Sequence, residues 1–190
     1  NNSESVQSDR ADDLAFNNLG SFITTMTATT SGSNFLTLGS VSGLTYNLPI
    51  KFVGTNFGGI TTGTSYWVRD IASVSPIAID SVSRNLSSVV TVNTAVSHNL
   101  VSNQTVSISN TGLVDQASVL ITVVDYNTFT FTSSTPGLIN LTTVTNAIVT
   151  PAPQIKISAS SLGPALSLTT AAGSNSMLTN WVSVPYVPVV

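Results

Sequence analysis

His98 is the only histidine in the 190-residue sequence, and it limits the catalytic chemistry that the chain could perform. A metal site built from several imidazoles is excluded, and a Ser-His-Asp triad would depend on this single side chain. The sequence also lacks the Gly-x-Ser-x-Gly pattern that marks the nucleophilic serine of many hydrolases. We therefore expect His98 to form hydrogen bonds within a turn or to pack beside Leu100.

The carboxylates do not indicate a glycosidase-like pair, which needs two acids held across a cleft. The acids are Glu4, Asp9, Asp12, Asp13, Asp70, Asp80, Asp115 and Asp125. Asp70 and Asp125 stand at corresponding ends of predicted strands, where an aspartate commonly caps a turn. The sequence has no cysteine that could form a disulfide or bind a metal as a thiolate. These residues predict a protein that is not an enzyme, with no catalytic residue, no metal site and no cofactor.

Aromatic side chains indicate contact surfaces rather than chemistry. Tyr66 and Trp67 are neighbours on a predicted strand, so one is expected in the core and the other at the surface or an interface. Residues 180–190 predict an extended tail with two prolines and no charge, in which Trp181 and Tyr186 are the expected assembly contacts. If the protein binds carbohydrate, the candidate stacking platforms are Trp67, Tyr126 and Trp181.

The stretch from 35 to 71 organises the fold prediction. Its apolar residues recur with a period of two over 35–38, 49–53 and 66–71, which places them on one face of a sheet. Glycines separate these runs, where turns often need backbone angles that other residues rarely adopt. The pattern predicts three strands with their turns. The threonine-rich run 22–30 that precedes them is expected to form an edge strand.

An internal repeat links this stretch to a later one. The first copy contains Leu44, Asn47, Ile50 and Phe52, and the second contains Leu100, Asn103, Val106 and Ile108 with the same spacing. Thr37 and Leu38 align with Thr91 and Val92 when a small gap is allowed. The repeat predicts a strand, a turn closed by an asparagine side chain and a returning strand, formed twice. Residues 119–124 and 128–131 then predict a hairpin around 125–127.

Two stretches resemble modules of phage particles. From Pro49 to Val68, the pattern Pro-Ile-x-Phe, Gly-Thr-x-Phe-Gly-Gly-Ile and Gly-Thr-x-Tyr-x-Val resembles a module in virion structural proteins of tailed bacteriophages, especially those of cyanobacteria. Residues 97–131, with Ser-His-Asn-Leu at 97–100 and Thr-Phe-Thr-Phe at 128–131, resemble a small β module of phage tail, baseplate and fibre proteins. That module usually has glycine where this chain has Asn99. The resemblance implies a structural role in a virion.

The resemblance also predicts a discontinuous domain. In the phage module, a run similar to residues 154–178 follows directly after the Tyr-x-Val strand, whereas residues 72–153 intervene in this chain. Prolines near both ends of the intervening stretch are typical of domain boundaries. Ile155 and Ile157 should then pair within the domain that contains residues 35–71.

We therefore predict an all-β protein of two small β-sandwich or barrel-like domains, one inserted in the other, with a short N-terminal helix. The host domain comprises residues 22–79 and 150–179, and the inserted domain comprises residues 80–149. An N-terminal arm over 1–21 includes the helix, which is expected from Ser8 to Leu19 because Ser8 can cap it and Gly20 can end it.

The composition favours a subunit of an assembly. Charged residues make up only 7% of the sequence and the net charge is -3, whereas an ordinary soluble domain has roughly 25% charged residues. Five scattered basic residues offer no patch for nucleic acid or for a membrane surface. We expect a structural protein of a tailed-phage virion, in the tail, baseplate or fibre, that is assembled in the host cytoplasm and contacts other virion proteins and copies of itself as a homo-oligomer. The alternatives are a capsid decoration protein and a carbohydrate-binding adhesin module.

Overall fold

The computed structural model describes residues 20–179, and its regular structure within them consists of β-strands alone. The prediction of an all-β protein is confirmed. The helix predicted from Ser8 to Leu19 and the tail predicted over 180–190 lie outside the described residues.

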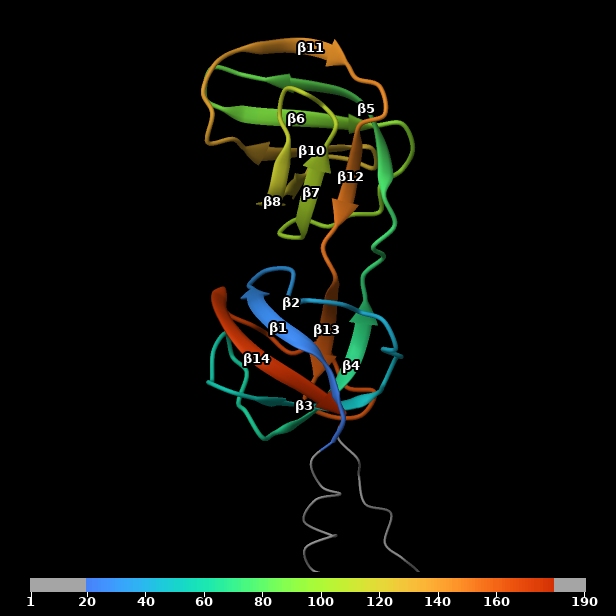
Figure 1. Cartoon of the computed structure of the whole chain (residues 1–190), viewed down its shortest axis with the longest axis vertical. Coiled ribbons are helices and arrows are strands. Elements are labelled where there is room, and N and C mark those ends of the chain that lie inside the picture. The colour runs from blue at the N-terminus through green and yellow to red at the C-terminus, as the bar shows by residue number, and fades with distance from the viewer. Residues whose placement is uncertain (1–19, 180–190) are drawn as a thin grey trace, which may run out of the picture.

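Six strands close into a first barrel (Figure 1). They are β1 (Phe22–Thr30), β2 (Phe35–Leu38), β3 (Pro49–Val53), β4 (Ser65–Ile71), β13 (Gln154–Ser158) and β14 (Ala171–Thr179). Their order around the barrel is β1-β14-β3-β4-β13-β2, and β2 pairs with β1 to close it. The prediction that residues 22–30 form an edge strand is wrong, because closure places β1 between β14 and β2 and a closed barrel has no edge.

Eight strands form a second, barrel-like sheet. They are β5 (Ile77–Arg84), β6 (Val89–Thr94), β7 (Thr105–Ser109), β8 (Gln116–Leu120), β9 (Thr122–Val123), β10 (Thr128–Thr132), β11 (Ile139–Thr143) and β12 (Ile148–Pro151). The order is β8-β7-β12-β5-β6-β10-β9, and β11 also pairs with β5. Strands β8 and β9 lie at the two ends of this order, and only Ile121 separates them in the sequence. The two edges of the sheet are therefore adjacent, and we call this sheet the second barrel. The predicted hairpin around 125–127 is present as the β9–β10 pair.

The first barrel is built from two separate parts of the chain. Strand β13 pairs with β4 so that Ile155 lies opposite Ile71 and Ile157 opposite Val68, which confirms the expected pairing. The Ala72 N–H donates a hydrogen bond of 2.9 Å to the Gln154 carbonyl. The chain therefore leaves the first barrel and returns to it at neighbouring residues. In between, the second barrel runs from Ile77 to Pro151, a few residues beyond the predicted range of 80–149 at each end.

The two barrels follow one strand plan. By their pairing order, β1, β2 and β3 correspond to β5, β6 and β7, and β13 corresponds to β10. The β8–β9 segment takes the place of β4, and the β11–β12 segment takes the place of β14. Leu36 lies opposite Ile155 in the first barrel as Val92 lies opposite Phe129 in the second. Leu36 thus corresponds to Val92, and the gap placed in the sequence repeat is wrong.

Both turns of the repeat lie at the predicted asparagines, but the prediction that the asparagine side chain closes each turn is wrong, because backbone angles and backbone hydrogen bonds hold them. Asn47 and Asn103 adopt left-handed backbone angles, with φ of 62° and 64°, which asparagine tolerates better than most residues. The N–H of Asn47 donates to the Val68 carbonyl at 2.6 Å, and that of Asn103 donates to the Ile121 carbonyl at 2.8 Å. Each turn therefore ties the start of one strand to the next segment of its barrel.

Each barrel encloses its own core. Large buried side chains of the first include Met26, Leu36, Phe52, Ile155 and Met177, and those of the second include Val92, Ile108, Ile121, Phe129 and Val149. In the inserted domain, Val123 is partly buried, and the buried apolar side chains include Val90, Val92, Leu100, Val106, Ile108, Phe129 and Phe131.

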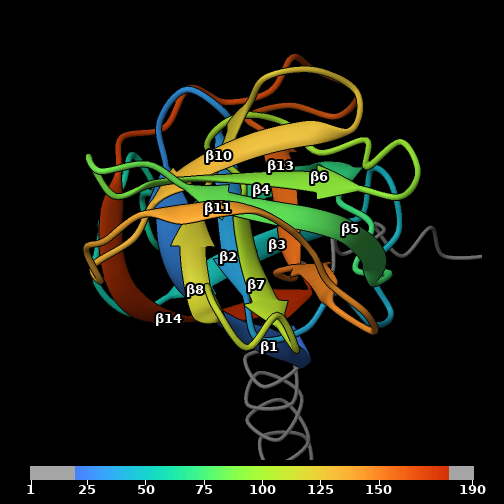
Figure 2. The ribbon, with the colours of Figure 1, turned by 90° about the horizontal axis from the view of Figure 1, so that it is seen from above.

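Hydrogen bonds join the barrels end to end. The Ser33 hydroxyl, in the β1–β2 turn, donates to the Asn103 carbonyl at 3.0 Å. The Gln154 side chain is fully buried and accepts a 3.3 Å hydrogen bond from the Thr105 N–H of the second barrel, while its Nε2 donates to the Thr37 hydroxyl. Viewed from above, the second barrel lies over the first (Figure 2). These bonds, together with two chain crossings, fix the junction of the barrels.

Candidate functional site

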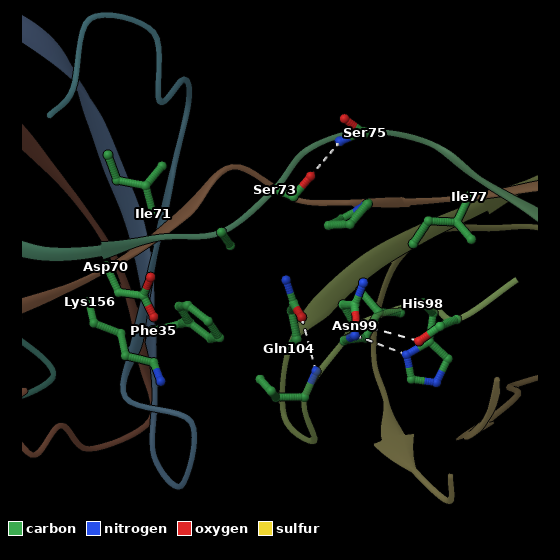
Figure 3. Close-up of a pocket in the computed structure, with 15 residues that line it drawn as sticks. Phe35, Asp70, Ile71, Ser73, Ser75, Ile77, His98, Asn99, Gln104 and Lys156 are labelled. Carbon is green, nitrogen blue, oxygen red and sulfur yellow. Dashed lines mark hydrogen bonds between the residues drawn. The ribbon is translucent and has the colours of Figure 1, made fainter. Parts of the chain in front are cut away.

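A pocket of about 420 Å³ lies at the junction between the two barrels (Figure 3). One wall comes from β2, β4 and β13 of the first barrel, and the other from the 97–104 segment of the second. The chain crossings at 72–77 and 151 complete it. Junctions between domains are common places for ligand sites, and this pocket is therefore the candidate functional site.

The first-barrel wall carries a pair of opposite charges. Asp70 on β4 and Lys156 on β13 lie opposite one another in the antiparallel ladder. The Lys156 ammonium lies 5.0 Å from the centre of the Phe35 ring, a cation–π geometry. This wall can therefore present a carboxylate, an ammonium group and an aromatic ring to a small polar molecule.

The opposite wall is a hydrogen-bonded turn around His98. The Leu100 N–H donates to His98 Nδ1 at 2.9 Å, which confirms the turn bond expected of this residue. Gln104 Oε1 accepts a 3.2 Å hydrogen bond from the Val101 N–H. Asn99 has a φ of 50°, a left-handed angle that also suits the glycine of the resembled module. The polar atoms of this wall mainly hold its own backbone.

The imidazole of His98 is committed to the second barrel. Because Nδ1 accepts from a backbone N–H, the neutral ring carries its proton on Nε2. That nitrogen is buried and has no hydrogen-bond partner among the described residues. The ring packs edge-on against Phe129, with centroids 5.8 Å apart, and Figure 3 shows it turned away from Asp70 and Lys156. This geometry favours a structural role for His98.

No protein-family model, curated protein or solved structure matches the chain. Because the two barrels follow one strand plan, acidic residues at corresponding positions of the two barrels can be compared directly.

Asp125 caps the β9–β10 turn, as predicted. Its Oδ1 accepts a 3.0 Å hydrogen bond from the Asn127 N–H, and this bond lowers the pKa of the Asp125 carboxyl. The matching prediction for Asp70 is wrong, because Asp70 lies within β4 opposite Lys156 and corresponds to Thr122 rather than to Asp125. A tight turn follows β9, whereas the second barrel follows β4.

Asp115 is a second capping residue, which the sequence analysis missed. Its Oδ1 accepts hydrogen bonds from the Thr111 hydroxyl at 2.6 Å and from the Thr111 N–H at 2.8 Å. The hydroxyl bond is the main cause of a lowered pKa at Asp115. The Thr-x-x-x-Asp spacing of residues 111–115 is the sequence pattern that could have predicted this cap. Both of these carboxylates stabilise turns.

The described residues contain no group of three His, Asp or Glu side chains that could hold a metal ion. Within 20–179, no helix is long and apolar enough to cross a membrane.

The aromatic predictions have separate outcomes. Tyr66 is buried and Trp67 is partly buried, which confirms that the pair divides between core and surface. Tyr126 is 72% exposed, and its carbonyl accepts a 3.0 Å hydrogen bond from the His98 N–H beside the pocket. Trp181 and Tyr186, the predicted assembly contacts, lie outside the described residues.

Proposed function

We propose that the chain is a non-enzymatic structural subunit of a tailed-bacteriophage virion, in its tail, baseplate or fibre. It acts by packing against copies of itself and against other virion proteins. The observation that carries this proposal is the exposed apolar surface of the second barrel in a chain with only 7% charged residues.

Large exposed apolar side chains lie near the paired ends of β5 and β11. Leu86 follows β5, Leu138 precedes β11 and Leu141 lies within it, and they are 80%, 59% and 70% exposed. Grouped exposed apolar side chains commonly mark interaction sites. The surrounding serine and threonine hydroxyls lose water at a contact more cheaply than charges do. Such a surface suits burial against a partner.

The arrangement of the barrels suits a spacer. They lie in line along the longest axis of the molecule (Figure 1), and the buried Gln154 bonds to residues of both. Two antiparallel crossings resist bending better than a single linker. The resemblance of two stretches to phage modules supports a virion as the assembly in which this spacer acts.

The test uses purified particles of a phage whose genome encodes this chain. Mass spectrometry should detect the chain in particles at a fixed ratio to the other structural proteins, and a particle map should contain its two-barrel shape. Its position in the map also separates tail, baseplate and fibre from a capsid decoration protein. Recovery of the chain only from the free lysate fraction would contradict the proposal.

A carbohydrate-binding module is the second candidate, and the exposed side chain of Tyr126, whose backbone carbonyl bonds to the pocket residue His98, favours it. An aromatic face next to hydroxyl and amide groups is suited to a sugar ring. In this case Tyr126→Ala should abolish glycan binding. The control Leu120→Ala, an exposed change on β8, should leave glycan binding intact. Absence of glycan binding by the unmodified chain would remove this candidate.

A further inference from the structure

Strand β11 has an open edge. Among residues 20–179 it pairs with β5 and with no other strand. Four of its five residues are exposed, and its sequence Ile-Asn-Leu-Thr-Thr has neither charge nor proline. Proteins usually protect an edge strand with charged residues, proline or a covering loop. An edge without them is suited to accept another strand.

The first barrel shows what covers the corresponding position. There, residues 169–175 lie against the β3–β4 connection, which runs from 54 to 64. The Thr169 N–H donates to the Gly58 carbonyl at 3.1 Å, and the Asn175 side chain exchanges two 2.9 Å hydrogen bonds with the Thr55 backbone. The Phe57 ring lies so close to Gly173 that a Cβ there would be 2.6 Å from it. The connection thus supplies both hydrogen bonds and an aromatic ring.

The second barrel lacks this cover because its β7–β8 connection is shorter, from 110 to 115. That connection is closed by the bonds between Thr111 and Asp115. Its contact toward the β11–β12 segment is a 3.3 Å hydrogen bond from Asn110 Nδ2 to the Asn146 carbonyl, beyond the end of β11. Leu138 and Leu141 remain exposed.

We propose that residues 181–190 of a neighbouring copy add to the open edge of β11. This inference rests on the proposed assembly function and names its contact. The segment begins Trp-Val-Ser-Val, with the alternation and neutrality that match β11. Trp181 and Tyr186 supply the aromatic contact that Phe57 provides in the first barrel. Pro185 and Pro188 limit regular pairing to the first part of the segment.

The donor is a different copy because of where β14 ends. Thr179 is hydrogen-bonded to Ser21 at the end of the first barrel remote from the second, and β11 lies at the far end of the molecule (Figure 1). A contact from this end of one copy to β11 of the next is head-to-tail. Repetition of a head-to-tail contact builds a ring or a filament rather than a closed two-fold dimer.

The absence of cysteine makes cross-linking a clean test. Two full-length single-cysteine variants, Thr142→Cys on β11 and Val182→Cys, are mixed and treated with a short bis-maleimide. We expect a mixed dimer that carries one of each variant, identified by mass spectrometry. The matched control replaces Thr142→Cys by Ser118→Cys, an exposed position on β8, and its mixed dimer should form several times less.

Dimers formed mainly between two Thr142→Cys chains would overturn the proposal in favour of β11 pairing with itself. A mixed yield no higher than that of the Ser118→Cys control would also overturn it. As a second variant, Leu141→Lys should weaken self-association about tenfold, because it places a charge at the strand edge. Val124→Lys, a change at a 60% exposed position between β9 and β10 of the same barrel, should not.

The outcomes separate this inference from the proposed function. If cross-linking fails while the chain is found in purified particles, the strand addition is wrong and the structural role stands. If the mixed dimer forms but particles lack the chain, the contact is real and the virion assignment is wrong.

Discussion

The β9–β10 turn of the second barrel and the β4–β13 connection of the first occupy the same place in two barrels of one plan. In the second barrel, residues 125–127 close the connection. In the first, the entire second barrel fills it. The strand ends are nevertheless held alike: the Val124 N–H donates to the Thr128 carbonyl, and the Ala72 N–H donates to the Gln154 carbonyl, each at 2.9 Å. The barrel thus depends on adjacent strand ends rather than on what joins them.

The largest expected effect comes from exchanging these connections. Replacing residues 73–153 by Asp-Tyr-Asn, the sequence at 125–127, joins Ala72 to Gln154 through the tight turn of the second barrel. We expect a smaller barrel that still unfolds cooperatively, because loop length changes the closure cost only weakly. Circular dichroism during thermal unfolding measures it. A product with strand signal but no cooperative transition would show that the barrels do not have equivalent connections.

Core truncations test whether the barrels are separate cooperative units. Phe52 in the first barrel and Phe129 in the second are both fully buried. Each change to alanine should lower the free energy of unfolding by about 3–5 kcal/mol. Hydrogen exchange followed by mass spectrometry should show the loss of protection mainly in the barrel that carries the change. Equal loss in both barrels after either change would indicate that they unfold as one unit.

The asparagine turns should respond unequally to glycine. Both positions have a left-handed φ that glycine accepts. Asn47 Oδ1 also accepts a hydrogen bond from the Leu162 N–H, whereas the bond from Ser33 to Asn103 uses the backbone carbonyl, which glycine retains. Asn47→Gly should therefore cost about 1 kcal/mol and Asn103→Gly less than about 0.5 kcal/mol. Chemical denaturation of the two variants measures the difference, and a larger loss at Asn103 would contradict it.

The smallest expected effect is a loss of stability of the second barrel at low pH. Hydrogen bonds from Thr111 lower the pKa of Asp115 below its ordinary value of 3.8 in the folded chain. The stabilisation is complete above 3.8 and is lost as the pH falls through the lower folded pKa, because the unfolded chain binds the proton first. Asp115→Asn should flatten this part of the curve of melting temperature against pH. If Asp115→Asn leaves the curve of melting temperature against pH unchanged, the cap contributes no net stabilisation.

Local patterns allowed part of this fold to be predicted. Alternation gave the strands around Phe52 and Val68, and shared spacing gave the asparagine turns, because both signals lie within a few residues. The position of β1 could not be obtained in this way. Its neighbour β14 follows at the far end of the sequence, so closure of the barrel leaves no local trace.

The candidate site was less predictable for the same reason. His98 and Asp125 act within their own turns, and their roles followed from residue type. Asp70 meets Lys156 across strands that are separated by a whole barrel, so its role depends on the tertiary fold. Strand β11 alternates apolar and polar residues only over 139–142, and because four of its five residues are exposed, this short alternation marks no buried face.

The pairing of Ile71 with Ile155 also constrains the order in which the chain folds. In an unfolded chain, bringing these residues together closes a loop of roughly eighty residues before any strand contact stabilises it. If the second barrel folds first, its paired residues Ile77 and Val149 already hold the two crossings side by side. The inner barrel then acts as a folded clamp, and closing the outer one becomes nearly as local as forming a hairpin. On this pathway, slowing the second barrel slows the whole molecule, and the first barrel completes last.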